Sequence, residues 1–150
     1  MAEQEKVKGA VIIEGHVQGL SNTRALGEAG IPVIVVDRSN CIARYSRYCK
    51  GFYYSPDFEG DGFADFLISL GKNKGLDGWL LMPSNDHAVH TISRNRYRLD
   101  LIFKTITPGP EIIDKIYDKK TLLQIARNIK IPCPPAQYFK SPEERLSDDL

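Results

Sequence analysis

Long hydrophobic runs are absent from this sequence of 150 residues. The longest, Ala10–Ile13 and Ile31–Val36, fall far below the roughly 20 apolar residues that a membrane-spanning helix requires. The N-terminal segment MAEQEKVKG mixes charges and lacks the apolar stretch of a secretory signal. The sequence therefore predicts a cytoplasmic protein with no membrane partner.

Cysteine pairs and an excess of one charge are also missing. The three cysteines, Cys41, Cys49 and Cys133, form no CxxC motif, a pattern unlike a disulfide framework or a zinc knuckle. The 20 lysines and arginines nearly balance 19 aspartates and glutamates, whereas a nucleic-acid-binding protein needs a basic excess for counterion release. We therefore expect reduced thiols and no nucleic-acid partner.

What the sequence does contain is an alternation of apolar runs and amphipathic segments. Apolar runs without polar alternation are typical of strands buried on both faces of a parallel sheet. Helical segments between them complete βαβ units, which predict an α/β fold with a doubly wound, mostly parallel open sheet. The expected strands are Lys8–Glu14, Pro32–Asp37, Gly51–Tyr54, Trp79–Met82 and Leu101–Ile106.

Capping residues and apolar spacing place the helices between these strands. Ser21 is expected to cap the first helix, and Gly30 follows its end as a stop signal. Leu26 and Ala29 are expected to face inward from this helix. Asp61 is expected to cap a second helix, whose residues at i, i+3, i+4 and i+7 form one apolar stripe. The stripe consists of Phe63, Phe66, Leu67 and Leu70.

The pattern changes after residues 108–110, where proline and glycine interrupt it and two helical segments follow without a strand between them. These segments are Glu111–Tyr117 and Asp118–Asn128, and a charged segment from Ser141 predicts the start of a further helix. The change places a domain boundary near Tyr117, which divides the chain into residues 1–117 and 118–150.

The crevice at the carboxyl ends of the strands is where open parallel sheets bind ligands. The first loop there, GHVQGLSNTR, carries Gly15 and Gly19 at a spacing that matches neither the GxGxxG fingerprint nor a P-loop. Its amides and the following helix start could cradle an anion or carboxylate, or the glycines could merely permit a tight turn. Together with Ser84 and Asp86 after the fourth strand, they are the candidate substrate-binding residues.

Three further features each allow a functional and a structural interpretation. Asp37 ends the second strand, where dinucleotide-binding proteins place a ribose-binding acid, or it is a solvated carboxylate. The segment Arg38–Lys50 holds basic and aromatic residues without acids, which suits a small anion or a solvated loop. His87 and His90 lie on one expected helix, as metal ligands or as surface residues.

Lys119 is a candidate phosphate contact in the C-terminal part of the chain. Asp118 can cap the helix there, and Lys119 adds a cation to the amide groups of its first turn. That arrangement suits a phosphate group, and a solvated lysine is the alternative.

The order of these pieces resembles the N-terminal region of ATP-grasp ligases, above all the carbamoyl phosphate synthetase large-chain-like and carboxylate–amine ligase members. In that family an acid–lysine pair, an apolar helix and a proline turn open the ATP-grasp domain, although residues 129–132 here replace the usual glycine-containing version. The resemblance implies a Rossmann-like preATP-grasp domain at 1–117, a truncated ATP-grasp start at 118–150, and Lys119 as a contact to ATP phosphates. The matching stretches are VIIEGHVQGLSNTRALGEAGIPVIVVD, YSRYCKGFYYSP, WLLMPSNDHAVHTIS and YDKKTLLQIARNIKIPCPP.

An ATP-dependent ligase activity follows from this resemblance for the complete enzyme. Ligases of this type phosphorylate a carboxylate with ATP, and an amine then attacks the acyl phosphate. ATP and Mg²⁺ would be the cofactors, and most of their ligands would lie in the missing C-terminal ATP-grasp domain. The expected partners are a carboxylate, an amine, that missing domain and, in a homodimer, a second copy of the chain.

The isolated chain is therefore expected to be inactive and to hold no catalytic residue and no metal site. Two other functions share the same sheet and stay open at this point. One is a non-catalytic small-molecule binding module, and the other is an NAD(P)-binding Rossmann domain, from which GxGxxG is missing.

Overall fold

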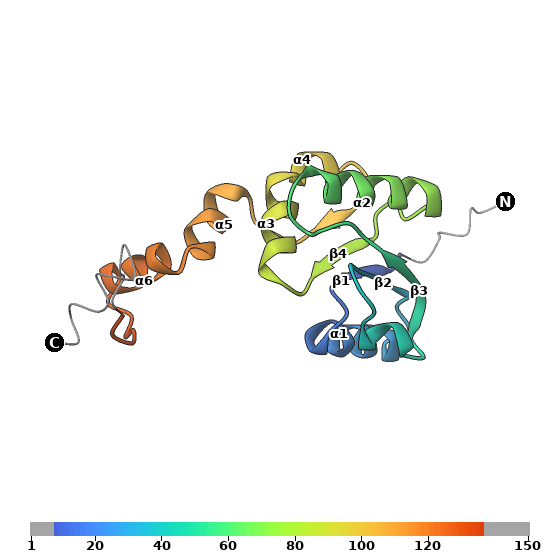
Figure 1. The fold of residues 1–150 in the computed structure, drawn as a ribbon, viewed down its shortest axis with the longest axis horizontal. Coiled ribbons are helices and arrows are strands. Elements are labelled where there is room, and N and C mark those ends of the chain that lie inside the picture. The colour runs from blue at the N-terminus through green and yellow to red at the C-terminus, as the bar shows by residue number, and fades with distance from the viewer. Residues whose placement is uncertain (1–7, 137–150) are drawn as a thin grey trace. The chain divides into compact units, whose positions relative to one another are not determined.

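A computed structural model describes residues 8–136 of the chain. The chain divides into two compact units, Met1–Ile113 and Asp114–Leu150. The first unit contains a sheet of five parallel strands in the order β3-β2-β1-β4-β5, with helices on both faces (Figure 1). This architecture confirms the predicted doubly wound α/β fold.

The strands follow the predicted apolar runs closely. β1 (Ala10–Ile13) is the central strand, between β2 (Val33–Asp37) and β4 (Leu80–Pro83). β3 (Cys49–Tyr54) and β5 (Lys104–Thr105) are the two edge strands. The chain moves outward from β1 to β3 and then returns to the other side of β1 with β4. The winding therefore reverses between β1 and β4.

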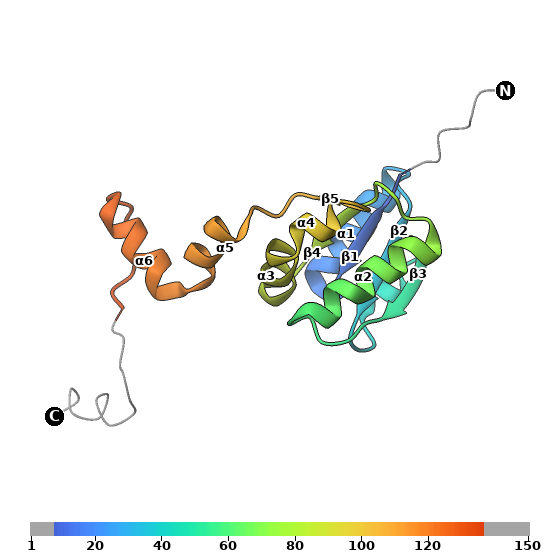
Figure 2. The same cartoon turned by 90° about the horizontal axis from the view of Figure 1, so that it is seen from above.

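Helices cover the two faces of the sheet unequally (Figure 1). One face carries α1 (Val17–Glu28) and the short 3₁₀ helix η1 (Ile42–Tyr45). The other face carries α2 (Asp61–Lys74), α3 (Asp86–Arg94) and α4 (Arg96–Leu99), which lie over the sheet in the view of Figure 2. The sheet is thus the middle layer of three.

Each face of the sheet has its own hydrophobic core because successive strand residues point to opposite sides. Val11 and Ile13 of β1 pack in the core on the α2 side, whereas Ala10 and Ile12 pack on the α1 side. All four are at most 1% exposed. A central strand covered on both faces must be apolar at every position, which is why its sequence lacks alternation.

The first helix starts earlier than predicted. Its N-cap residue is His16 rather than Ser21, and Ser21 is an exposed residue within α1. Gly19 and Thr23 are the buried residues of α1; Leu26 is partly buried in the core, as predicted, whereas the prediction for Ala29 is wrong because it is exposed. The helix can begin directly after β1 because Gly19 has no side chain to strike the strand end.

The stop signal of this helix is confirmed. Gly30 has φ +77°, the left-handed conformation that glycine adopts readily after a helix end. The N–H of Ile31 then donates to the carbonyl of Leu26 at 3.0 Å, which satisfies a carbonyl of the last turn.

The second helix carries the predicted apolar stripe but a different cap. Phe63, Leu67 and Leu70 are buried, and Phe66 packs against the same core. The N-cap residue is Gly60, and Asp61 is the first helical residue, whose carboxylate accepts a hydrogen bond from Asn95 Nδ2 at 3.3 Å. The predicted capping role of Asp61 is therefore wrong, because the side chain is directed to Asn95.

The fifth strand is shorter than predicted. Only Lys104 and Thr105 pair with β4, and Leu101 is 83% exposed. The residues just before it form α4, a single helical turn whose Leu99 is fully buried. The apolar run does not reveal this shortening, because Ile102 and Phe103 are buried in the core without belonging to a strand.

Both helices predicted after the sheet are present. They are α5 (Pro110–Tyr117) and α6 (Lys119–Asn128), and the division between the two units falls within α5. Asp118 caps α6 as predicted, since its Oδ1 accepts a hydrogen bond from the Thr121 N–H at 2.7 Å. The helix expected from Ser141 lies outside the described residues. Within residues 8–136, no helix has the length and hydropathy of a membrane span.

Candidate functional site at the carboxyl edge of the sheet

The carboxyl ends of β1, β2 and β4 meet at one edge of the sheet. The parallel register places Ile13 beside Pro83, so Glu14 and Ser84 leave the sheet side by side. The Ser84 N–H donates to the Ile13 carbonyl at 3.0 Å, and the Glu14 N–H donates to the Val36 carbonyl at 2.9 Å. The reversal of winding between β1 and β4 makes this edge the place where such sheets bind ligands.

A buried carboxylate holds the first loop in place. Asp37, 2% exposed, accepts a hydrogen bond from the Gly15 N–H at 2.8 Å through Oδ2. Its Oδ1 accepts from the Ser39 N–H at 3.1 Å. Both oxygens thus join the loop after β1 to the loop after β2. This structural role accounts for an acid at the end of β2 without any contact to a ribose.

Close packing explains both glycines of the first loop. A Cβ on Gly15 would lie 2.4 Å from Cys41 Sγ, and a Cβ on Gly19 would lie 2.0 Å from the Glu14 carbonyl oxygen. Glu14 itself has φ +68°, which turns the chain sharply between β1 and α1. Gly15 and Gly19 are therefore brought together in one tight turn, and both are buried.

The start of α1 faces the same edge. The first hydrogen bond within the helix runs from the Leu20 N–H to the His16 carbonyl at 2.8 Å. The preceding amide groups, including that of Gly19, point out of the helix start and form the positive end of its dipole. A small cavity of about 180 Å³ adjoins this start and is lined by His16, Asn40, Cys41, Ile42 and Tyr45.

The turn after β4 is organised by Asn85. Its side-chain oxygen accepts a hydrogen bond from the Ala88 N–H at 2.7 Å and so caps α3. Asp86 is exposed in the first turn of α3, where its charge complements the helix dipole. The Ser84 hydroxyl lies between these features, is buried, and has no hydrogen-bond partner among the described residues. A buried hydroxyl favours a polar partner, so Ser84 fits a ligand contact.

Ser55 is a second buried hydroxyl at this edge, and the sequence analysis did not single it out. It follows β3, and its N–H donates to the Asp37 carbonyl at 2.9 Å. Its Oγ, like that of Ser84, has no partner within the described part of the chain. No motif marks it, because only the strand order places the end of β3 next to that of β2.

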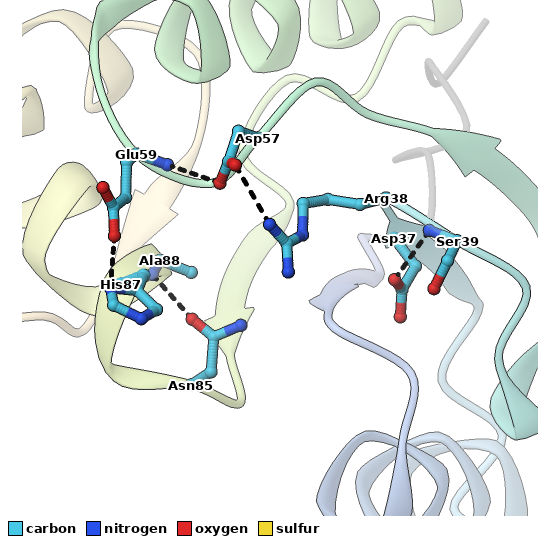
Figure 3. A network of polar contacts seen from close by, with 8 residues as sticks. All are labelled: Asp37, Arg38, Ser39, Asp57, Glu59, Asn85, His87 and Ala88. Carbon is cyan, nitrogen blue, oxygen red and sulfur yellow. Dashed lines mark hydrogen bonds and ion pairs between the residues drawn. The ribbon is translucent and has the colours of Figure 1, made fainter.

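A polar strap, formed by Arg38, Asp57, Glu59 and His87, joins the loop after β2, the loop between β3 and α2, and the first turn of α3 at this edge (Figure 3). Arg38 Nη1 lies 3.0 Å from Asp57 Oδ2, and His87 Nδ1 lies 2.8 Å from Glu59 Oε1. The Glu59 N–H donates to Asp57 Oδ1 at 3.4 Å and, with Arg38, lowers the pKa of Asp57. These groups are solvent-exposed, so the strap orients the loops more than it stabilises the fold.

The contacts of His87 and His90 test the hypothesis that these two residues are metal ligands. His87 faces Glu59, and His90 Nε2 accepts a hydrogen bond from Arg94 Nε at 3.1 Å. The described residues contain no group of three or more histidine, cysteine or acidic side chains that could hold a metal ion. His87 thus contacts a loop residue, and His90 contacts a residue one turn along its own helix.

Cys41 is sequestered beneath the first loop. The thiol is 4% exposed, and burial, followed by the nearby Asp37 carboxylate, raises its pKa. The cysteine thiols of the described residues form no disulfide. A protonated, buried thiol is a poor nucleophile, so Cys41 serves packing.

Lys119 lies in the second unit, whereas Gly15, Gly19, Ser84 and Asp86 lie in the first. It is the first residue of α6, exposed and next to the capping residue Asp118. The Thr121 N–H lowers the pKa of Asp118 and so favours the charged form of the cap. Lys119 thus has the helix-start position that the sequence predicted.

Comparison with known proteins yields matches only among solved structures, since no protein-family model and no curated protein matches the sequence. N5-carboxyaminoimidazole ribonucleotide synthetase from Thermotoga maritima matches with a TM-score of 0.60 and 21% identity, over 94% of this chain and 36% of that one. The biotin carboxylase domain dimer of Hydrogenobacter thermophilus 2-oxoglutarate carboxylase, in complex with MgADP, ADP and bicarbonate, matches with a TM-score of 0.59 and 17% identity. That second match covers 96% of this chain and 33% of the other.

Both of these structures are ATP-grasp enzymes. The chain has the fold of their N-terminal region and spans about a third of their length. The likeness extends past the sheet, because 94% coverage of 150 residues includes most of the second unit.

Proposed function

We propose that this chain is the N-terminal part of an ATP-dependent carboxylate–amine ligase of the carbamoyl phosphate synthetase large-chain-like type. The observation that carries the proposal is the match to two ATP-grasp enzymes over 94% and 96% of the chain. Doubly wound sheets occur in many proteins, but a match that continues through α6 favours an ATP-grasp ligase over a free-standing Rossmann domain.

Under this proposal residues 1–117 are the preATP-grasp domain, and residues 118–150 begin the ATP-grasp domain. Lys119 contacts the phosphates of ATP. Its ammonium group and the amides of the α6 start both attract anions, and the Asp118 cap keeps that helix start in place. ATP, bound mainly by the rest of the enzyme, supplies the phosphoryl group that activates the carboxylate, and Mg²⁺ would offset the charge of its phosphates.

The carboxylate substrate binds at the carboxyl edge of the sheet. The Gly15 N–H donates to Asp37, so Gly15 shapes the pocket rather than binding the substrate through its amide. The amide of Gly19, at the start of α1, attracts the carboxylate, and the Ser84 hydroxyl donates to it. Asp86, exposed at the start of α3, orients the amine.

The remaining partners follow from the same proposal. The rest of the ATP-grasp domain, a small-molecule carboxylate and an amine complete the site, and two copies form a homodimer. The protein acts in the cytoplasm.

The test is ADP formation by the protein made from its complete gene. We expect ADP release that depends on one carboxylate from a panel and on ammonia or an amine, with Ser84→Ala raising the KM for the carboxylate. Asp77→Asn, at an exposed position before β4, is the matched control. Failure of every carboxylate to stimulate ADP release would contradict the proposal.

A non-catalytic small-molecule binding module is the second candidate. The specific observation in its favour is the cavity of about 180 Å³ beside the start of α1 in the sheet-containing unit itself. Tight binding of a metabolite by the 150-residue chain, without ATP consumption by the complete protein, would favour this candidate instead.

A further inference from the structure

A second, larger cavity lies away from the carboxyl edge. It measures about 430 Å³, is open to solvent, and lies between the second half of α1 and the segment from the end of η1 to the start of β3. Since β3 begins at Cys49, these residues lead to the amino end of the sheet rather than to its carboxyl end. Its volume falls in the range of about 300 to 1,000 Å³ that small-molecule sites occupy. The lining residues are Arg24, Glu28, Tyr45, Ser46, Arg47 and Tyr48.

The wall opposite α1 is positioned by specific contacts. A Cβ on Gly27 would lie 2.3 Å from the Cβ of Tyr48, so a glycine is needed for this close approach of α1 and the loop. The Tyr48 N–H donates to Ser46 Oγ at 3.3 Å, and the Cys49 N–H donates to the Ser46 carbonyl at 3.0 Å. The loop therefore presents Arg47 and Tyr48 in a defined turn before the chain enters β3.

The charge of the cavity favours an anion, because two arginines face one glutamate. Arg47 lies over the Tyr48 ring at 4.7 Å from its centroid and donates to the Tyr48 hydroxyl, which limits the motion of its guanidinium. Among the described residues, the Arg24 side chain makes no hydrogen bond or ion pair. Two guanidinium groups offer parallel N–H donors that match the oxygens of a phosphate.

We propose that this cavity binds a phosphate monoester attached to a planar ring. Arg24 and Arg47 hold the phosphate, because a dianion with three terminal oxygens can engage both guanidinium groups. The Tyr45 side chain, 72% exposed, offers a ring face on which the planar group stacks. Glu28 accepts a hydrogen bond from an N–H or O–H donor on the ring.

The two cavities can be distinguished by their residues. Tyr45 lines both, whereas Arg24 and Ser46 line only the larger cavity and His16 and Cys41 line only the smaller one. The amide signals of these residues in a ¹⁵N NMR titration therefore report which cavity a ligand enters. Phenyl phosphate is the probe, with inorganic phosphate, benzoate and phenol as the comparison compounds.

We expect phenyl phosphate to shift the amide signals of Arg24 and Ser46, with weaker binding at higher salt. It should bind more tightly than any of the three comparison compounds. Arg24→Gln should weaken the affinity about tenfold or more, since a charge-assisted contact is lost. Arg96→Gln is the matched control, because Arg96 lies on the opposite face of the sheet and pairs with Asp100 at 3.0 Å.

Four results would overturn the proposal. Amide signal shifts confined to His16 and Cys41 would show that the ligand binds in the smaller cavity at the carboxyl edge. Equal affinity of Arg24→Gln and the unmodified chain would remove the phosphate contact. If benzoate bound as tightly as phenyl phosphate, the cavity would not require a phosphate group. If inorganic phosphate bound as tightly as phenyl phosphate, the cavity would not require a ring.

Discussion

Gly19 lies where α1 packs most closely against the backbone of the first loop, and a single methyl group at this position should lower the stability of the fold. The added Cβ of Gly19→Ala would lie 2.0 Å from the Glu14 carbonyl oxygen, which belongs to the backbone and cannot rotate away. We expect a loss of about 1 to 3 kcal/mol in the free energy of unfolding, the usual cost of overpacking. Urea denaturation followed by Trp79 fluorescence measures it, since Trp79 packs against the core.

Gly62→Ala is the matched control for this prediction. Gly62 lies in the first turn of α2 with open space around its Cβ position. Alanine there should stabilise the protein by about 0.4 to 1 kcal/mol, because it restricts the unfolded chain. Unchanged stability of Gly19→Ala would mean that α1 can shift its start.

We expect Asp37 to contribute to the stability of the fold rather than to ligand binding. Asp37→Ala removes the acceptor of the Gly15 and Ser39 amides, and a buried donor left unpaired costs about 1 to 3 kcal/mol. We expect a loss of about 3 kcal/mol in the free energy of unfolding by urea denaturation. Asp77→Asn, an exposed carboxylate, should change it by about 0.5 kcal/mol or less. A small effect at Asp37 would revive its interpretation as a binding residue.

At the scale of the element, the start of α6 should depend on pH through its cap. The Thr121 N–H lowers the pKa of Asp118 from its ordinary value of 3.8. A carboxyl group with a lowered folded-state pKa contributes stability that is present above 3.8 and is lost as the pH falls through the folded value. We expect the Thr121 amide signal to move, and α6 to fray, only at pH values below 3.8.

The variant Asp118→Ala provides the control for the titration. It should show a frayed α6 at every pH and no titration at Thr121, because the accepting carboxylate is gone. A Thr121 signal that titrates equally in both proteins would assign the effect to another group.

The same helix start is where the ATP contact can be tested. In the complete protein, Lys119→Ala should weaken ATP binding about tenfold to a hundredfold, the range of a charge-assisted hydrogen bond. Calorimetry with ATP measures it. Lys120→Ala is the matched control, since the next residue of a helix points elsewhere. Equal ATP affinity of Lys119→Ala and the unmodified protein would favour the alternative interpretation, in which Lys119 is a solvated lysine.

At the scale of the whole molecule, the 150-residue chain should form no ADP by itself. It spans about a third of the length of the ATP-grasp enzymes whose fold it shares. On the proposed function, most groups that bind MgATP belong to the remainder. A coupled assay with MgATP, carboxylates and ammonia measures the rate. ADP formation above background would contradict the expectation that this chain lacks a complete active site.

The sequence by itself determined the sheet. The runs around Val11 and Val35 contain only apolar residues because both faces of these strands are covered, and that requirement is visible locally. The stop at Gly30 and the cap at Asp118 were also predictable, because each acts through bonds within a few residues. The same reasoning led to the first loop and to Ser84 as parts of one edge.

Only the tertiary structure decided how that edge is built. Ser21 is as good a capping residue as any, yet α1 starts at Val17 because Gly19 packs against the Glu14 carbonyl. The hydrogen bond from Gly15 to Asp37 joins residues 22 positions apart, and the polar strap joins two loops and the start of α3. Such contacts depend on the strand order, which places distant segments side by side, and no local pattern encodes that order.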